Sequence, residues 1–161
     1  MKFNIKDPGS ALTHFIAMIL AGIAAVPLLL KALRSSGRFC MAALAVFIVS
    51  MILLYAASTI YHTFDISEHV NRILRKIDHM MIFILIAGTY TPVCLIVLGN
   101  PVGYRLLATV WTIAVAGIIY ALKLPLFNSR HKYFGSHEIF HLFVMGGSFC
   151  HYVMMFRYVA A

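Results

Sequence analysis

The sequence predicts an all-α fold: a polytopic transmembrane helical bundle with five spans, which forms a single transmembrane domain over residues 1–161. Composition is the first observation behind this prediction, because 62% of the 161 residues are hydrophobic and 11% are charged, whereas soluble domains average about 45–50% and about 25%. The second is that the apolar residues gather in runs of about 20 residues, the length of a spanning helix. The runs lack the two-residue alternation of barrel strands, so each is expected to be a helix.

The predicted spans follow one another with short connections between them. They cover residues 11–33, 39–61, 80–98, 102–122 and 136–158. Residues 7–10, Asp-Pro-Gly-Ser, provide a turn and a cap before the first span, and that span is long enough to be retained rather than cleaved as a signal peptide. Pro27 and Pro92 fall inside spans, where a proline removes a helical hydrogen bond. Residues 64–76 are expected to form a connection, with Asp78 opening the third helix.

The positive charge is distributed as in membrane proteins. The net charge of +8 comes from short clusters of Lys and Arg between apolar runs. Such clusters face anionic headgroups, so a nucleic-acid partner is excluded. Counted on alternate sides of the membrane, eight basic residues lie on the side of the N-terminus and five on the other. The N-terminus is therefore predicted to be cytoplasmic.

This alternation brings polar residues from distant parts of the sequence to one membrane level. The cytoplasmic ends of the predicted spans carry, in chain order, His14, Ser58 with His62, Asp78 with His79, and His137 with His141. Ionisable side chains within a membrane segment are costly and usually functional. We therefore expect a site near the cytoplasmic face.

A zinc site is the chemistry that these residues predict. His137 and His141 are four residues apart, so on a helix both rings project from one face and can share a metal ion. With His62 they supply three imidazoles, and zinc held in this way keeps an open position for water, which is the catalytic arrangement. Asp78 would hold that water or orient a ligand. His14 is expected nearby as an interfacial or supporting residue.

Two alternatives compete with this interpretation. An HxxxH pair arises in helices by chance, in which case the histidines are packing residues. Residues 137–141 also match HExxH, the zinc metalloprotease motif in which Glu138 would be the general base. An intramembrane protease would need a third, acidic ligand on a later helix, and the sequence after Tyr158 offers none, so this alternative is disfavoured.

Several stretches of the sequence resemble one known family. They are DPGSALTH at residues 7–14, Ser58-Thr59-Ile60-Tyr61-His62, Asp78-His79, IFILIAGTYTP at residues 82–92, and FGSHEIFHLFVMGGSFCHY at residues 134–152. Together they resemble the bacterial hemolysin III family, the prokaryotic branch of the progestin and adiponectin receptor (PAQR) family, over essentially the whole chain. The resemblance implies that His62, His137 and His141 bind Zn2+, that Asp78 holds the attacking water, and that Ser58 lies beside the site.

The chain departs from this family in its number of spans. Relatives have seven, with two further helices before the one that carries the histidine pair, whereas only residues 124–135 intervene here. Removing two spans keeps His137 on the same side of the membrane. A five-helix bundle would either leave the site open to lipid or need a second subunit, in a homo-oligomer, to close it.

The resemblance also implies a function. Alkaline ceramidases resemble this family within a wider superfamily, which implies, as an enzyme hypothesis, a zinc-dependent hydrolysis of a lipid amide or ester by a protein of the bacterial inner (plasma) membrane that serves membrane homeostasis. The alternatives are a membrane-homeostasis role without catalysis and a channel-like cytolysin (hemolysin). Membrane lipids are the expected partners in each case.

Overall fold

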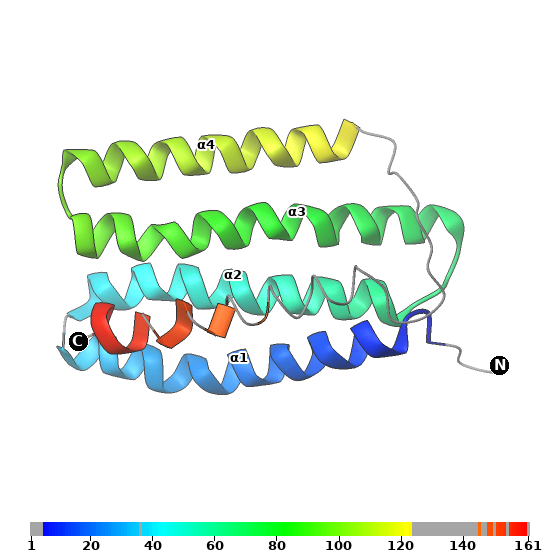
Figure 1. The fold of residues 1–161 in the computed structure, drawn as a ribbon, viewed down its shortest axis with the longest axis horizontal. Helices are drawn as coiled ribbons and strands as arrows, with labels where there is room; N and C mark the ends of the chain where they lie inside the picture. Colours follow the sequence, from blue (N-terminus) through cyan, green and yellow to red (C-terminus); the bar gives the residue numbers. More distant parts are fainter. Residues whose placement is uncertain are drawn as a thin grey trace.

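Residues 5–35, 37–123, 145, 148–149, 151–153 and 155–160 are described in the computed structural model of the chain. Figure 1 shows four long helices lying side by side in a row, in the order in which they follow along the chain. They are α1 (Pro8–Ser35), α2 (Gly37–Thr63), α3 (Glu68–Pro92) and α4 (Pro101–Lys123). Two π-helical segments complete the described elements, η1 (Val93–Leu98) directly after α3 and η2 (Met155–Val159) near the C-terminus. The all-α prediction is confirmed for this part of the chain.

Four helices of the described chain are long and apolar enough to cross a membrane. They are Pro8–Arg34, Gly37–Thr63, Glu68–Leu98 and Pro101–Ile119. The protein is thus a multi-pass membrane protein, and the first four predicted spans are confirmed. The fifth, predicted over residues 136–158, lies largely outside the described residues, and no fifth spanning helix occurs among those that are described.

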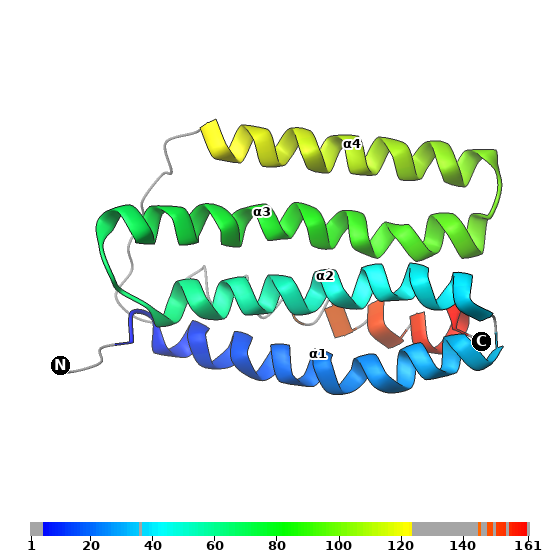
Figure 2. The same cartoon turned by 180° about the vertical axis from the view of Figure 1, so that it is seen from behind.

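Successive helices run in opposite directions, as Figure 2 shows from behind. The backbone N–H of Asp7 donates to the carbonyl oxygen of His62 at 2.9 Å, which joins the start of α1 to the end of α2. The ammonium of Lys76 in α3 donates to the carbonyl oxygen of Leu122, near the end of α4, at 2.7 Å. One end of the row therefore contains the start of α1, the end of α2, the first half of α3 and the end of α4. We call it the N-terminal end of the bundle.

The third helix begins earlier than the sequence predicted. Residues 64–76 were expected to be a connection, but α3 starts at Glu68, so the predictions of a helix start near residue 80 and of Asp78 as its opening residue are wrong. Ser67 caps the helix by accepting a hydrogen bond from the N–H of Val70 at 3.3 Å, and Glu68 places a negative charge in the first turn. Neither Gly nor Pro interrupts residues 68–87. The charges of this stretch are compatible with a helix that projects beyond the apolar span.

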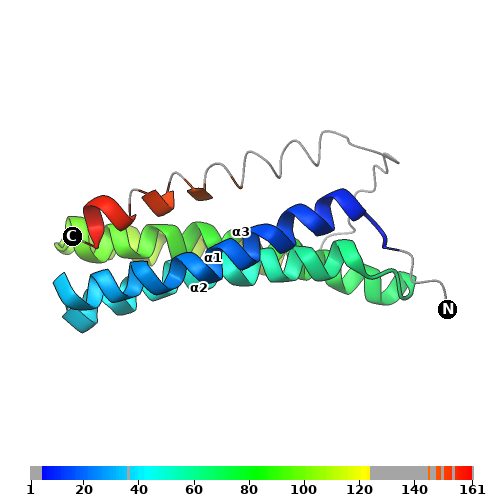
Figure 3. The ribbon, with the colours of Figure 1, turned by 90° about the horizontal axis from the view of Figure 1, so that it is seen from below.

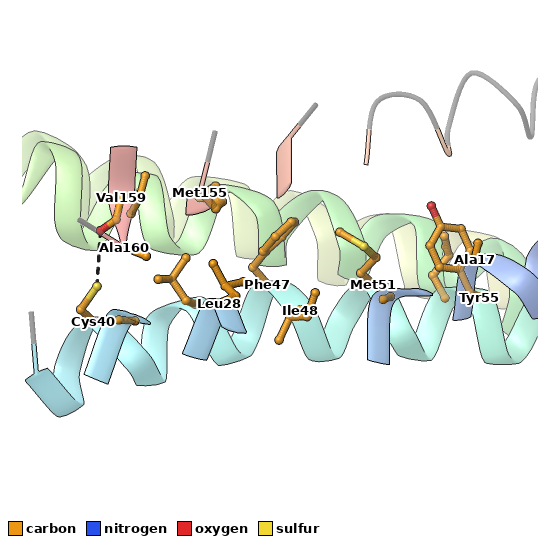
Figure 4. Packing of buried hydrophobic residues seen from close by; sticks show 14 residues of the cluster. Ala17, Leu28, Cys40, Phe47, Ile48, Met51, Tyr55, Met155, Val159 and Ala160 are labelled. Carbon is orange, nitrogen blue, oxygen red and sulfur yellow. Dashed lines mark hydrogen bonds between the residues drawn. The ribbon is translucent and has the colours of Figure 1, made fainter. Parts of the chain in front are cut away.

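The largest apolar core lies between α1, α2 and the described C-terminal residues. Leu28, Leu44 and Phe47 are fully buried there, together with Met155 of η2. Figure 4 shows Met155 packed over the side chains of Leu28 and Phe47. The thiol of Cys40 donates to the carbonyl oxygen of Val159 at 3.5 Å. The described C-terminal residues thus cover one side of α1 and α2, as the view in Figure 3 shows.

The opposite situation holds on the outside of the bundle, where large apolar side chains are exposed. Ile23, Val102 and Ile113 are each more than 60% exposed. A soluble protein rarely exposes so many large apolar groups together. In a spanning helix these side chains face lipid tails, which agrees with the multi-pass assignment.

The contact between α2 and α3 depends on a small residue. Gly88 is buried in α3, and the residues around it, Thr89, Thr91 and Pro92, are buried too. Small residues let spanning helices approach closely, and close approach is the main source of attraction between helices in lipid. These four residues therefore form part of the seam between α2 and α3.

We predict that Gly88→Ala lowers the free energy of unfolding by about 1–3 kcal/mol, the usual cost of overpacking a tight contact. A Cβ at this position would overlap the Ser50 hydroxyl oxygen and lie 2.8 Å from the Ser50 Cβ. Gly22→Ala is the matched control, because nothing lies within 4 Å of a Cβ there. Thermal unfolding in detergent measures both, and equal stability of the two variants would contradict the prediction.

Candidate functional site

Buried polar side chains gather at the N-terminal end of the bundle. Ser10, His14, Ser58 and His62 are each 2% exposed, and Asp78 is 6% exposed. We call these residues, with Asp7, Tyr61 and Arg75, which contact or interact with them, the polar cluster. Three different helices contribute to it, so the alternation of the spans does bring residues from distant parts of the sequence to one level.

His62 is held by Asp7. Its Nδ1 lies 3.1 Å from Oδ2 of Asp7, which is on the segment directly before α1. The backbone reinforces this contact, because the N–H of Asp7 donates to the carbonyl oxygen of His62 at 2.9 Å and the N–H of Lys6 donates to that of Thr63 at 3.4 Å. The imidazole side chain is 3% exposed and the carboxylate side chain 42%. A buried ring is therefore linked to a partly solvated carboxylate.

His14 brings a second imidazole to the same place. Its ring stacks on the ring of His62, with centroids 6.0 Å apart and an interplanar angle of 11°. Tyr55, a residue of α2, also contacts His14, and the centroids of their two rings are 5.7 Å apart. The expectation that His14 lies near His62 is confirmed.

Tyr61 connects the segment before α1 with α3. Its hydroxyl lies near the side chain of Arg75 and interacts electrostatically with Arg75, Asp7 and Asp78. The ammonium of Lys6 lies 3.6 Å from the centroid of the Tyr61 ring, a cation–π contact. Two carboxylates and two cations, those of Asp7, Asp78, Arg75 and Lys6, thus surround one phenol.

Asp78 reaches the cluster from within α3. It lies ten residues after Glu68, about 15 Å along the helix axis. In Figure 1 the start of α3 extends beyond the end of α2, which is why a residue so far from the helix start belongs to this end of the bundle. The neighbouring His79 is part-exposed, and its Nδ1 lies 2.7 Å from the carbonyl oxygen of Arg75.

Only part of the predicted zinc site falls on the described chain. His137 and His141 lie outside the described residues, as does Glu138 of the protease alternative. Among the residues that are described, no group of three or more His, Cys, Asp or Glu side chains could hold a metal ion. His62 is therefore the one proposed ligand that the structure places, and Ser58 lies one turn before it on α2.

The surroundings of His62 fit the role of a metal ligand. Metal-binding histidines usually donate one ring N–H to a carboxylate, which orients the ring and leaves the other nitrogen to face the ion. The carboxylate of Asp7, in contact with Nδ1 of His62, corresponds to that partner.

Sequence reasoning treated Asp7 only as part of a turn and missed Tyr61 and Arg75 as members of the cluster. Asp7 could have been identified from the alternating direction of the predicted spans, because this alternation places residues 7 and 62 at the same membrane level.

Comparisons with known proteins agree with this architecture. The sequence profile described as "Haemolysin-III related" matches residues 3–132, a range that includes Ser58, His62 and Asp78. Hemolysin-3 of Bacillus cereus is 39% identical over 121 residues, which are 75% of this chain and 55% of that protein. The Hemolysin-3 homolog of Bacillus subtilis (strain 168) is 38% identical over 121 residues, 74% of this chain and 56% of that protein.

The chain spans about half the length of the curated relatives that it matches. The family profile nevertheless covers most of the chain, and the resemblance found in the sequence is thereby confirmed. This protein belongs to the Haemolysin-III related family.

Proposed function

We propose that this chain is a zinc-binding membrane protein that hydrolyses an amide or ester bond of a membrane lipid near the cytoplasmic face, in the service of membrane homeostasis. The observation that carries the proposal is the polar cluster: His62, Ser58 and Asp78 are buried together at one end of a membrane bundle. Burying ionisable groups among apolar spans is costly, so a functional reason for it is expected.

The proposed ligands of Zn2+ are His62, His137 and His141. When bound, zinc held by three imidazoles would polarise a carbonyl group and lower the pKa of a water molecule to about 7. His62 is supported in this role by the carboxylate of Asp7 at its Nδ1. The other two ligands are proposed from their four-residue spacing.

Asp78 and Ser58 would carry out the remaining steps. The Asp78 carboxylate accepts a proton from the attacking water, whose oxygen bonds to the acyl carbon while the carbon–nitrogen or carbon–oxygen bond breaks. Asp78 then returns the proton to the leaving amine or alcohol. The Ser58 hydroxyl, one helical turn from His62, would hydrogen-bond the substrate. Lipids would enter from the membrane, and a second copy of the chain would close the open side of the bundle.

We predict that purified protein contains about one zinc per chain and that His62→Ala and His137→Ala each remove it. Elemental analysis of the purified variants measures the metal content. His69→Ala is the matched control, because His69 is an exposed histidine of α3. Zinc retained at the wild-type level in His62→Ala would refute the proposed ligand set.

The orientation of the chain follows from its basic residues and can be tested separately. We predict that a cysteine at Glu68 is shielded from a membrane-impermeant maleimide in intact cells, whereas one at Asn100, in the turn before α4, is labelled. The assay uses a background in which the three native cysteines are replaced by alanine. The reverse labelling pattern would place the N-terminus outside.

A channel-like cytolysin is the second candidate, favoured by the name Hemolysin-3 that the relatives carry. The two functions differ in their need for Asp78. We predict that Asp78→Asn lowers hydrolysis of ceramide-like or phospholipid substrates by about 100-fold or more, since it removes a general base. Glu138→Gln is the control, because only a protease of the HExxH type needs that residue.

The same purified proteins are tested for release of a dye from lipid vesicles. Absence of lipid hydrolysis, together with dye release that Asp78→Asn leaves unchanged, would replace the hydrolase with the cytolysin.

A further inference from the structure

We propose that Asp7 is the positioning residue of His62: it fixes the tautomer and the orientation of the imidazole, so that Nε2 is the nitrogen that would bind a metal ion. The inference rests on the proposed zinc function, and it adds a residue that lies on the segment before α1, outside the predicted ligand set. Its role is to act through His62, not to touch the metal.

The tautomer follows from the chemistry of the pair. A neutral imidazole carries one N–H and one lone pair, whereas an ionised carboxylate can only accept a hydrogen bond. Because Oδ2 of Asp7 lies 3.1 Å from Nδ1 of His62, the hydrogen belongs on Nδ1. The lone pair is then on Nε2, which is the form a ligand requires. An acidic partner at one nitrogen also makes the other a stronger donor to a metal.

The backbone of Asp7 is itself held in place. The carbonyl oxygen of Asp7 accepts a hydrogen bond from the N–H of Ala11 at 2.9 Å, and the N–H of Asp7 donates to the carbonyl oxygen of His62 at 2.9 Å. Pro8 follows directly as the first residue of α1, where its fixed φ suits the start of a helix. The start of α1 therefore fixes the backbone from which the carboxylate reaches Nδ1 of His62.

The His62 ring is restrained on its other sides as well. His14 stacks on it, with centroids 6.0 Å apart, and the ring of Tyr61 lies 4.7 Å away, centroid to centroid, at 57°. These contacts limit rotation of the imidazole, while the bond to Asp7 determines which of its two nitrogens faces inward. Stacking alone would leave that choice open, because the two faces of the ring are equivalent to a neighbouring ring.

A merely structural ion pair is the competing explanation. Such a pair would tie α1 to α2, so its removal would lower the stability of the protein without a specific effect on zinc. A positioning role changes zinc affinity instead, because a ring free to rotate or to change tautomer does not keep the lone pair of Nε2 directed at the ion. The two explanations are separated by measuring both quantities on the same variants.

The experiment compares Asp7→Ala, Asp7→Asn and His62→Ala with the wild type, all as full-length protein in detergent. Zinc affinity is measured by competition with a chelator, and thermal unfolding is measured on the zinc-free proteins. Asp65→Asn is the matched control, since Asp65 is an exposed acid at the same end of the bundle and its partner is Asn71.

We expect Asp7→Ala to weaken zinc binding by about 10–100-fold, the usual effect of removing a carboxylate behind a metal-binding histidine. Asp7→Asn should lose less, because its amide oxygen still accepts the hydrogen bond from Nδ1. The control should bind as the wild type does. If Asp7→Ala does not fold, Asp7→Glu decides, since displacing the carboxylate by one methylene should still weaken binding.

The measurements distinguish a failure of the positioning role from a failure of the proposed zinc site. Zinc lost in His62→Ala but bound with unchanged affinity by the Asp7 variants overturns the positioning role alone. Unchanged zinc in His62→Ala, or no zinc in the wild type, overturns the proposed site and this inference with it. Lower thermal stability of the zinc-free Asp7→Ala and Asp7→Asn proteins, with zinc affinity unchanged, would identify the pair as structural.

Discussion

The constraint on which this structure depends is that a backbone in lipid must satisfy its own hydrogen bonds. Each segment that enters the membrane is therefore a helix, and each helix has to cross before the chain can turn. Short turns such as the one around Gly37, whose φ of +80° favours glycine, then reverse the direction. The polar cluster follows from this geometry, because the start of α1 and the end of α2 meet at one level through the bond between Asp7 and His62.

The helices are not equally well embedded in the protein. Half of the spanning window of α2 is buried, against 11% for α4. Lipid tails are as apolar as leucine side chains, so helices in a membrane associate through close packing and hydrogen bonds rather than through the hydrophobic effect. Two side-chain bonds attach α4 to α3, from Trp111 to Thr91 and from Lys76 to Leu122. The cluster is therefore supported chiefly by α1, α2 and α3.

The sequence was sufficient to predict four spans and the gathering of His14, Ser58, His62 and Asp78, because hydropathy and alternation are encoded in the order of the residues. The start of α3 was missed, since charged residues before an apolar run were interpreted as a loop although Ser67 caps a helix there. The bond from Asp7 to His62 could not be foreseen, because a contact across 55 residues depends on how the chain enters α1. The proposed ligands His137 and His141 lie beyond the described residues.

The difference in exposure across one hydrogen bond has a consequence for any reaction at this end of the bundle. The Asp7 side chain is 42% exposed and the His62 side chain 3%, so this hydrogen bond joins an accessible carboxylate to a buried imidazole. The proposed hydrolysis would need water at a bond of a lipid dissolved in the apolar interior. An exposed carboxylate joined to a buried imidazole would let water reach that bond without hydrating the rest of the bundle.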